Sequence, residues 1–163
     1  ATLENLGVEL TPIKLPEHAD MDALQMLLVD EAAAFDELVQ TGRINLLIQD
    51  REEPEDMLMR IARLLPAVEY MQIQRLRMLM MQNMEKAMRD VDVYVAPHAG
   101  SPNTGTTSLT GHPAISVPNG FDKEGRPTGI LFVGQLYGEA ALMAVAKKYQ
   151  DANDFHLAHP ALS

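Results

Sequence analysis

The most constraining feature of this sequence is a nearly continuous apolar run, GILFVGQ, at residues 129–135. A short run of this kind fits a strand that is buried on both faces, because an exposed face would carry alternating polar residues. Such a strand needs a further layer on either side. GEAALMAVAKKYQDAN follows at 138–153 with the spacing of an amphipathic helix. The order of the elements predicts an α/β protein, in which a partial mixed sheet is flanked by helices.

Three further segments alternate apolar and polar side chains in the way that is typical of strands. They are VELTPIKLP (8–16), DVDVYVAP (90–97) and PAISVP (113–118). NGFDKEGRPTG, at 119–129, is rich in turn-forming residues and predicts a hairpin-like connection into the buried run. ATLENLG, at the start, has the form of a last helical turn with glycine as its stop, which leads us to expect further sequence upstream.

Apolar residues recur at helical spacing in three more segments, at about 21–39, 54–64 and 67–89. The last of these is the longest predicted helix, and it carries several of the eleven methionines. Methionine fills irregular cores and interfaces, which is the interpretation we favour; a Met-rich surface for varied partners is the alternative. Because 163 residues can bury one sizeable core, we expect a single domain over residues 1–163.

The composition excludes several classes of function. The formal net charge of -10 argues against nucleic acid as a partner, because such binding depends on Lys and Arg neutralising phosphates. No apolar run approaches the length of a membrane span, so we expect no membrane partner. Cysteine is absent, which excludes disulfides, thiolate chemistry and Cys-based metal sites, and fits a cytoplasmic protein.

The last sixty residues, from about 104 to 163, resemble the C-terminal end of the amidase signature family. The family has a small polar run with Gly-x-Pro, a strand ending in Val-Pro, a Gly-Phe turn, Gly-x-Pro-x-Gly, a buried strand ending in Gly, a helix opened by Glu-Ala, and a closing His…His-Pro. The residues that match this order are Gly111, Pro113, Pro118, Gly120, Phe121, Gly125, Pro127, Gly129, Gly134, Glu139, Ala140, His156, His159 and Pro160. DVDVYVAP and LENLGVEL also resemble the preceding part of the family, so the resemblance covers nearly the whole chain.

The resemblance implies amide-bond chemistry, hydrolytic in an amidase or glutamine-dependent in the amidase component of a tRNA-dependent amidotransferase. Family members use a Ser–Ser–Lys triad, whose nucleophile lies in a Gly/Ser-rich segment upstream of the region seen here. This chain has no Gly-Gly-Ser-Ser run, and none of its lysines falls in the family's lysine motif. Those lysines are Lys14, Lys86, Lys123, Lys147 and Lys148. We therefore expect a C-terminal portion of the fold without catalytic residues of its own.

The segment TGTTSLTGHP, at 104–113, is the main candidate site. It is no phosphate loop, because no Lys or Arg lies between Asp92 and Asp122. Its serine lacks the context of an activated nucleophile. One interpretation is a helix N-cap or a tight turn, in which Thr106, Thr107 or Ser108 is the capping residue. The other, which the family resemblance implies, is the floor of the amidase pocket. Pro97 and His98 follow a strand end, where ligands of α/β sheets commonly bind. The residues predicted to line a substrate pocket are Pro97, His98, Thr106, Thr107, Ser108, Thr110 and Gly111.

The loop between Pro97 and Gly111 departs from the family, because many members carry a longer loop there, often with a short helix. In the family this loop shapes the substrate pocket, so the short form leaves the substrate class open.

We expect no metal site and no cofactor. His112 precedes a proline and is expected to bond to backbone. His156 and His159 lie in an irregular tail without a clustered carboxylate. The carboxylates of DREEPED, at 50–56, are predicted to form a solvated helix start.

Two hypotheses follow for the function. In the first, the chain supplies sheet strands and one pocket wall to an amidase, with the missing N-terminal half as its partner. In the second, it is a stand-alone interaction or dimerisation module derived from an amidase. An exposed sheet edge is a liability that chains usually cover, so a homodimer through that edge is expected to be possible under either.

Overall fold

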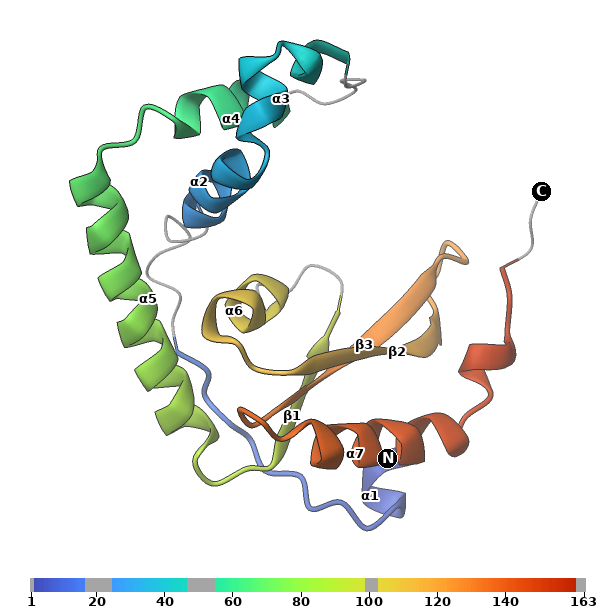
Figure 1. Cartoon of the computed structure of the whole chain (residues 1–163). Coiled ribbons are helices and arrows are strands. Elements are labelled where there is room, and N and C mark those ends of the chain that lie inside the picture. Colours follow the sequence, from blue (N-terminus) through green and yellow to red (C-terminus); the bar gives the residue numbers. More distant parts are fainter. Residues whose placement is uncertain (1, 17–24, 47–54, 99–102, 161–163) are drawn as a thin grey trace. The chain divides into compact units, whose positions relative to one another are not determined.

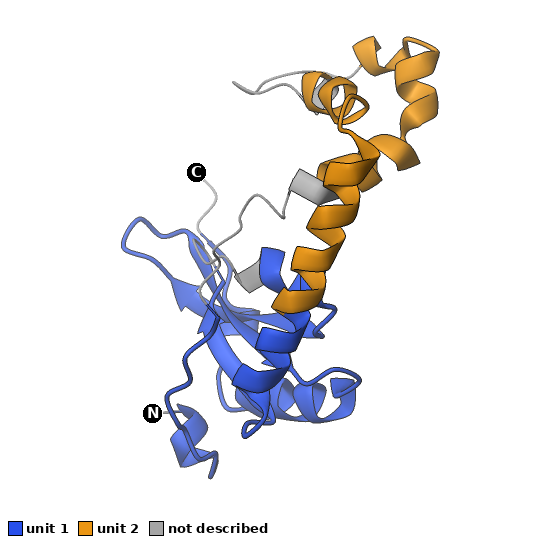
Figure 2. Ribbon diagram, turned by 90° about the vertical axis from the view of Figure 1, so that its left-hand side faces the viewer, with its two compact units in different colours: residues 1–16, 81–163 blue, residues 17–80 orange. Residues whose placement is uncertain are grey.

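The structure is a computed structural model, and it describes residues 2–16, 25–46, 55–98 and 103–160. The chain divides into two compact units, which Figure 2 distinguishes by colour: residues 1–16 with 81–163, and residues 17–80. We call them unit 1 and unit 2. The single domain over residues 1–163 stays a prediction.

Unit 1 is built on a three-stranded sheet with the order β1-β3-β2. The strands are β1 (Val93–Pro97), β2 (Ala114–Phe121) and β3 (Pro127–Gly134). Both neighbours of β3 are antiparallel to it. β3 therefore lies in the middle, and its residues Leu131 to Gly134 are buried, as the apolar run predicts. The α/β class is confirmed, and the pairs in the described part of the sheet are all antiparallel.

One face of the sheet packs against α7 (Glu139–Asp151) and α1 (Thr2–Asn5). Figure 1 shows α7 along one side of the sheet. Phe132 is fully buried in this core, and its ring centroid lies 5.4 Å from that of Tyr149 on α7. The core residues on this face are Leu3, Val117, Phe132, Leu142, Ala146 and Tyr149.

The opposite face packs against the last turns of α5 (Ala67–Met88), through Met84 and Met88. Tyr94, Leu131 and Val133 supply the sheet side of this core. The two methionines are fully buried, which confirms the role of core filler for this part of the Met-rich helix. Nε2 of Gln135, just after β3, donates hydrogen bonds to the carbonyl of Met88 and, at 2.8 Å, to that of Val91. These bonds hold the end of α5 against the sheet, since the last carbonyls of a helix have no partner within it.

Unit 2 contains α2 (Gln25–Ala34), α3 (Asp36–Gln40), the 3-10 helix η2 (Arg43–Leu46), α4 (Glu55–Ala62) and the first part of α5. Its core is small and consists of Ala32, Ile44 and Met59. Polar bonds between side chains add to it: Arg60 donates to Asn45 at 2.8 Å, and the Tyr70 hydroxyl donates to Asp30 at 2.8 Å.

The helix predicted at 21–39 is wrong as one helix, because its described part is broken between α2 and α3. Phe35 has φ -105° and ψ 19°, outside the helical region. The Phe35 N–H closes α2 on Glu31, and the Phe35 carbonyl accepts from Leu38 to open the next turn. Residues 21–24 lie outside the described part of the chain.

The predicted hairpin is confirmed, with β2 running three residues further than expected. One carboxylate organises its turn: Oδ1 of Asp122 accepts from the backbone N–H of Glu124 at 3.0 Å and of Arg126 at 2.9 Å. Oδ2 accepts from Nε of Arg126 at 2.7 Å. The Arg126 backbone N–H, helped by its guanidinium, lowers the pKa of Asp122 below its usual value.

The strand predicted at 8–16 is wrong for the structure as described. The segment has no regular secondary structure and belongs to no sheet there. The helix end before it is confirmed as α1, and Gly7 has φ 79°, which suits a left-handed helix stop. The tail contains a short 3-10 helix, η3 (Phe155–Leu157).

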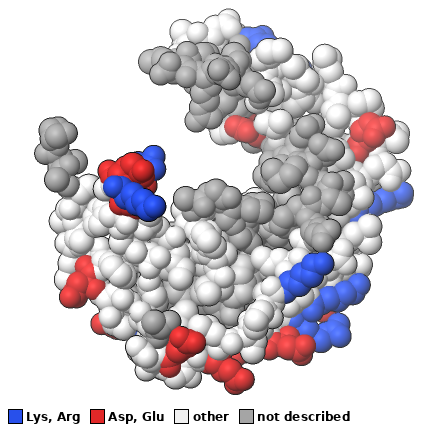
Figure 3. Space-filling model, turned by 180° about the vertical axis from the view of Figure 1, so that it is seen from behind, with Lys and Arg blue, Asp and Glu red and all other residues white. Residues whose placement is uncertain are grey.

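On the face shown in Figure 3, Lys and Arg lie in small groups among Asp and Glu. None of the described helices is long and apolar enough to cross a membrane.

Candidate functional site

Most of the segment 104–113 belongs to a helix, α6 (Asn103–Thr110), so Thr106, Thr107 and Ser108 lie within a helix and do not cap a turn. Figure 1 shows α6 on the side of the sheet away from α7. Three threonines on it, Thr106, Thr107 and Thr110, are buried with at most 6% of their surface exposed. We call these three residues the threonine cluster. Thr110 Oγ1 donates to the Thr106 carbonyl at 2.8 Å, a bond that satisfies a buried hydroxyl within the helix.

Gly111 ends α6 and turns the chain toward β2. Its N–H donates to the Thr107 carbonyl at 2.8 Å, and its φ of 79° is one that a side chain would disfavour. Gly111 is itself exposed, as is Ser108 on the outer side of α6.

His112 is buried, with 5% of its surface exposed, and its Nδ1 lies 2.9 Å from Thr110 Oγ1. The hydroxyl proton of Thr110 is already donated to Thr106, so the oxygen accepts and His112 Nδ1 carries the proton. The bond is to a side chain rather than to the backbone, which corrects the expectation for this residue. Burial lowers the pKa of His112 below its usual value, so the ring is neutral when folded.

This pKa shift predicts a loss of stability in mild acid. Between the folded pKa and the unfolded value of 6.5, the unfolded chain binds more protons, so the free energy of unfolding rises with pH and falls as pH drops through that window. We expect the urea midpoint to decrease more between pH 7.5 and pH 5 in the native chain than in His112→Gln. Equal decreases in the two proteins would contradict the prediction.

Pro97 and His98 are exposed at the end of β1. The His98 N–H donates to the Gly129 carbonyl at 3.2 Å, which continues the ladder past β1. A Cβ at Gly129 would lie 2.9 Å from Ser116 Oγ and 3.4 Å from His98 Cβ. His98 Cβ and the Ser116 hydroxyl therefore flank a bare stretch of backbone at Gly129, on the same sheet face as Leu131. Ser116 is not among the predicted site residues, because only the register brings it beside His98.

The seven residues predicted to line a pocket fall into two groups. The threonine cluster is buried, while Pro97, His98, Ser108 and Gly111 are exposed. Their role in binding stays a prediction. In the described part of the chain, no group of three or more His, Asp or Glu residues is placed to hold a metal. His156 and His159 are exposed, and the carboxylates at 50–54 lie outside the described residues.

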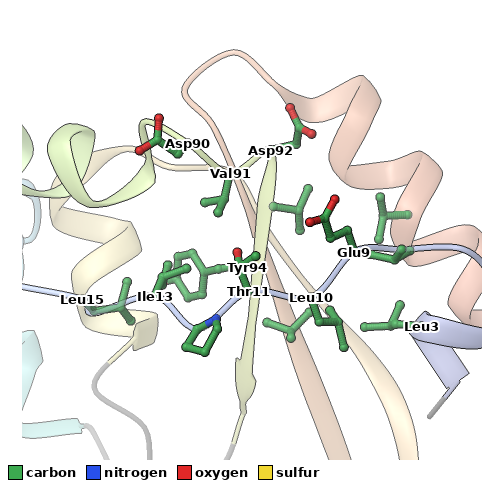
Figure 4. A pocket seen from close by; sticks show the side chains of 15 residues that line it. Leu3, Glu9, Leu10, Thr11, Ile13, Leu15, Asp90, Val91, Asp92 and Tyr94 are labelled. Carbon is green, nitrogen blue, oxygen red and sulfur yellow. The ribbon is translucent and has the colours of Figure 1, made fainter.

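A hollow of about 540 Å³ lies elsewhere in unit 1, and it includes none of the seven residues. Figure 4 shows it between β1 and the segment of residues 8–15, which we call the 8–15 segment. Its lining is mainly apolar, and Tyr94 contributes to it. Burial raises the pKa of Tyr94 to about 12, so its hydroxyl is neutral. Residues 8–16, most of which line one side of the hollow, have an alternating sequence, but that alternation predicts a strand and gives no indication of a hollow.

Sequence comparison finds relatives that are much longer than this chain. The chain is 37% identical over 112 residues to the A subunit of the glutamyl-tRNA(Gln) amidotransferase of Bordetella avium, which covers 56% of this chain and 22% of that protein. It is 31% identical over 115 residues to the corresponding protein of a Nostoc species, with 58% and 23% covered. The chain thus spans less than a quarter of these relatives. No family model matches the chain.

Solved structures match almost all of the chain. A 6-aminohexanoate cyclic dimer hydrolase superposes with a TM-score of 0.77 at 16% identity, covering 98% of this chain and 41% of that one. An amidase family protein from Bacillus anthracis gives 0.74 at 19% identity, with 99% and 35% covered. A bacterial aryl acylamidase of the amidase signature family gives 0.71 at 17% identity, with 96% and 40% covered.

The fold of this chain is that of part of the amidase signature enzymes. Together with the amidotransferase relatives, it supports the C-terminal portion of the amidase signature family as what the chain represents, which confirms the resemblance stated from the sequence.

Proposed function

We propose that this chain is a non-catalytic part of an amide-cleaving enzyme. It would supply sheet strands and one wall of the substrate pocket, while the Ser–Ser–Lys triad comes from an N-terminal amidase portion. The complete enzyme would hydrolyse an amide C–N bond or carry out glutamine-dependent amidotransfer. The cytoplasmic location stays a prediction of the sequence.

One observation carries the proposal: the chain matches an aryl acylamidase of the amidase signature family over 96% of its own length but only 40% of that enzyme's, and its sequence lacks the triad motifs. Hydrolysis needs a base within hydrogen-bond reach of a nucleophile. Thr110 on α6 and the neighbouring His112 do not offer this, because the Thr110 hydroxyl donates to the Thr106 carbonyl and the His112 Nδ1 proton is donated to the Thr110 oxygen. These groups fit a rigid wall, from which exposed His98 and Ser108 would face a substrate.

Reconstitution tests this function. We expect no release of ammonia from glutamine or simple amides by the chain alone. We expect turnover once the N-terminal portion of the Bordetella avium relative, up to the segment that matches this chain, is added. The N-terminal portion alone serves as the control. Turnover by the isolated chain, or failure of the two parts to form an active complex, would overturn the proposal.

A homodimer is the second candidate, because α5 exposes a row of large apolar side chains. These are Val68, Met71, Leu76, Met78 and Leu79, each at least 40% exposed. Apolar surface of this kind often marks an interaction site. Sedimentation velocity would decide: a concentration-dependent dimer supports the interaction module, and a monomer over the micromolar range contradicts it.

A further inference from the structure

The outer edge of β1 carries backbone groups that the described structure does not pair. His98 donates to Gly129, so these residues form a hydrogen-bonded pair of the antiparallel ladder. Bonding alternates along such a ladder, so Tyr94 and Ala96 also face β3. Val93 and Val95 therefore direct their N–H and C=O groups away from the sheet, toward the hollow, which both residues line.

The other edge of the sheet is better protected. β2 contains Pro118, which has no N–H, and its register shifts between Pro118 and Phe121. The ring of Phe155, in η3, lies 3.5 Å from where a Cβ of Gly120 would be. The Tyr149 hydroxyl also donates to Asn119. β1 is thus the edge that remains available for a further strand.

The 8–15 segment borders this edge without pairing to it. Val8 packs against the core on one face of the sheet, while Ile13 and Leu15 pack against the core on the other face. The segment therefore passes the edge of β1 and leaves the hollow between them, as Figure 4 shows. Its alternating sequence predicts a strand, but the segment joins no sheet among the described residues. Both observations are explained if a strand is missing from this place.

Charge at the rim indicates what such a strand would carry. Asp90 and Asp92 lie at the start of β1, and Glu9 lies on the 8–15 segment, as Figure 4 shows. All three are exposed. No Lys or Arg is among the residues that line the hollow. A complementary strand would be apolar where it meets the valines, with a Lys or Arg near these carboxylates.

We propose that the hollow receives one β-strand from the N-terminal portion of the amidase, which pairs with the outer edge of β1 at Val93 and Val95. This inference rests on the proposed function. The occupant follows from the size of the relatives, since more than half of each matched structure lies outside the region that this chain covers. Addition of a strand to an open sheet edge gives affinity through main-chain bonds. Along the five residues of β1, it would extend about 17 Å.

Amide hydrogen exchange tests the pairing directly. The full chain, labelled with ¹⁵N, is measured alone and with the N-terminal portion of the Bordetella avium relative. We expect the Val93 and Val95 amides to exchange fast in the chain alone and to slow at least tenfold in the complex. The Tyr94 and Ala96 amides, which face β3, are the internal control and should be slow in both.

A matched pair of variants tests how much the outward N–H of Val95 contributes to binding of the N-terminal portion. Val95→Pro removes one outward N–H and leaves the bonds to β3 in place, so it should weaken binding of the N-terminal portion by about ten- to a hundredfold. Val95→Thr keeps the N–H and a similar shape, and should bind within about threefold of the native chain. Circular dichroism of both variants checks that they fold, and the exchange experiment does not depend on them.

Each outcome separates the two proposals. An active complex in which the Val93 and Val95 amides remain unprotected overturns the docking site and leaves the proposed function standing. Absence of a complex overturns both. If the Val93 and Val95 amides of the chain alone are protected, and this protection increases with the concentration of the chain, a second copy occupies the edge. That result overturns the docking proposal.

Discussion

Replacing Phe132 with alanine is expected to lower the free energy of unfolding of unit 1 by about 3–5 kcal/mol. The ring is fully buried at the centre of the middle strand, and it contacts Tyr149 across the core. Its removal loses the transfer free energy of the ring and leaves a cavity that the surrounding strands and α7 fill only in part. Because a domain of this size has a total stability of about 5–15 kcal/mol, the loss is a large fraction of it.

Urea unfolding, followed by the NMR signals of β3, measures this loss. Phe121→Ala is the matched control, because Phe121 is also a phenylalanine but is 40% exposed, at the end of β2. We expect the control to cost about 1 kcal/mol or less. Equal losses for the two variants would contradict the assignment of Phe132 to the centre of the core.

Met84→Ala is expected to cost about 2–5 kcal/mol, since Met84 is fully buried between α5 and the sheet. Met84→Leu preserves most of the volume and should cost less than about 1.5 kcal/mol. The same urea experiment applies. Met81→Ala, on the same helix but 37% exposed, is the control and should have a small effect. A large loss for Met81→Ala with a small one for Met84→Ala would show that a different face of α5 meets the sheet.

Much of the fold could be predicted because its signals are local. The buried run at 129–135, the turn chemistry around Asp122 and the helix at 138–153 each have a pattern that depends on near neighbours. The break at Phe35 could not be predicted, because the apolar spacing continues through it and only the backbone geometry interrupts the helix.

The two largest errors in the predicted elements have different physical origins. The sequence of α6, NTGTTSLT, does not predict a helix, because most of its residues have low helix propensity, and burial of Leu109 and the threonine cluster overrides that preference. The strand predicted at 8–16 is wrong because a strand needs a partner, and sequence alternation says nothing about whether one is present.

The candidate site was predicted only as a set of residues. Their separation into a buried cluster and exposed groups depends on α6, which the sequence did not predict. Ser116 and His98 are 18 positions apart in sequence and become neighbours only through the antiparallel register on either side of Gly129. No local pattern contains that information.

The carboxylate of Asp122 has a consequence for folding as well as for the turn. It collects three donors from residues within four positions, so the tip of the hairpin can close before any distant part of the chain arrives. A slip of one position at this tip would exchange the two faces of β3, turning Phe132 toward the methionines and Leu131 toward α7. The Asp122 side chain at the tip thus helps to fix which face of the sheet packs against α7 and which packs against α5.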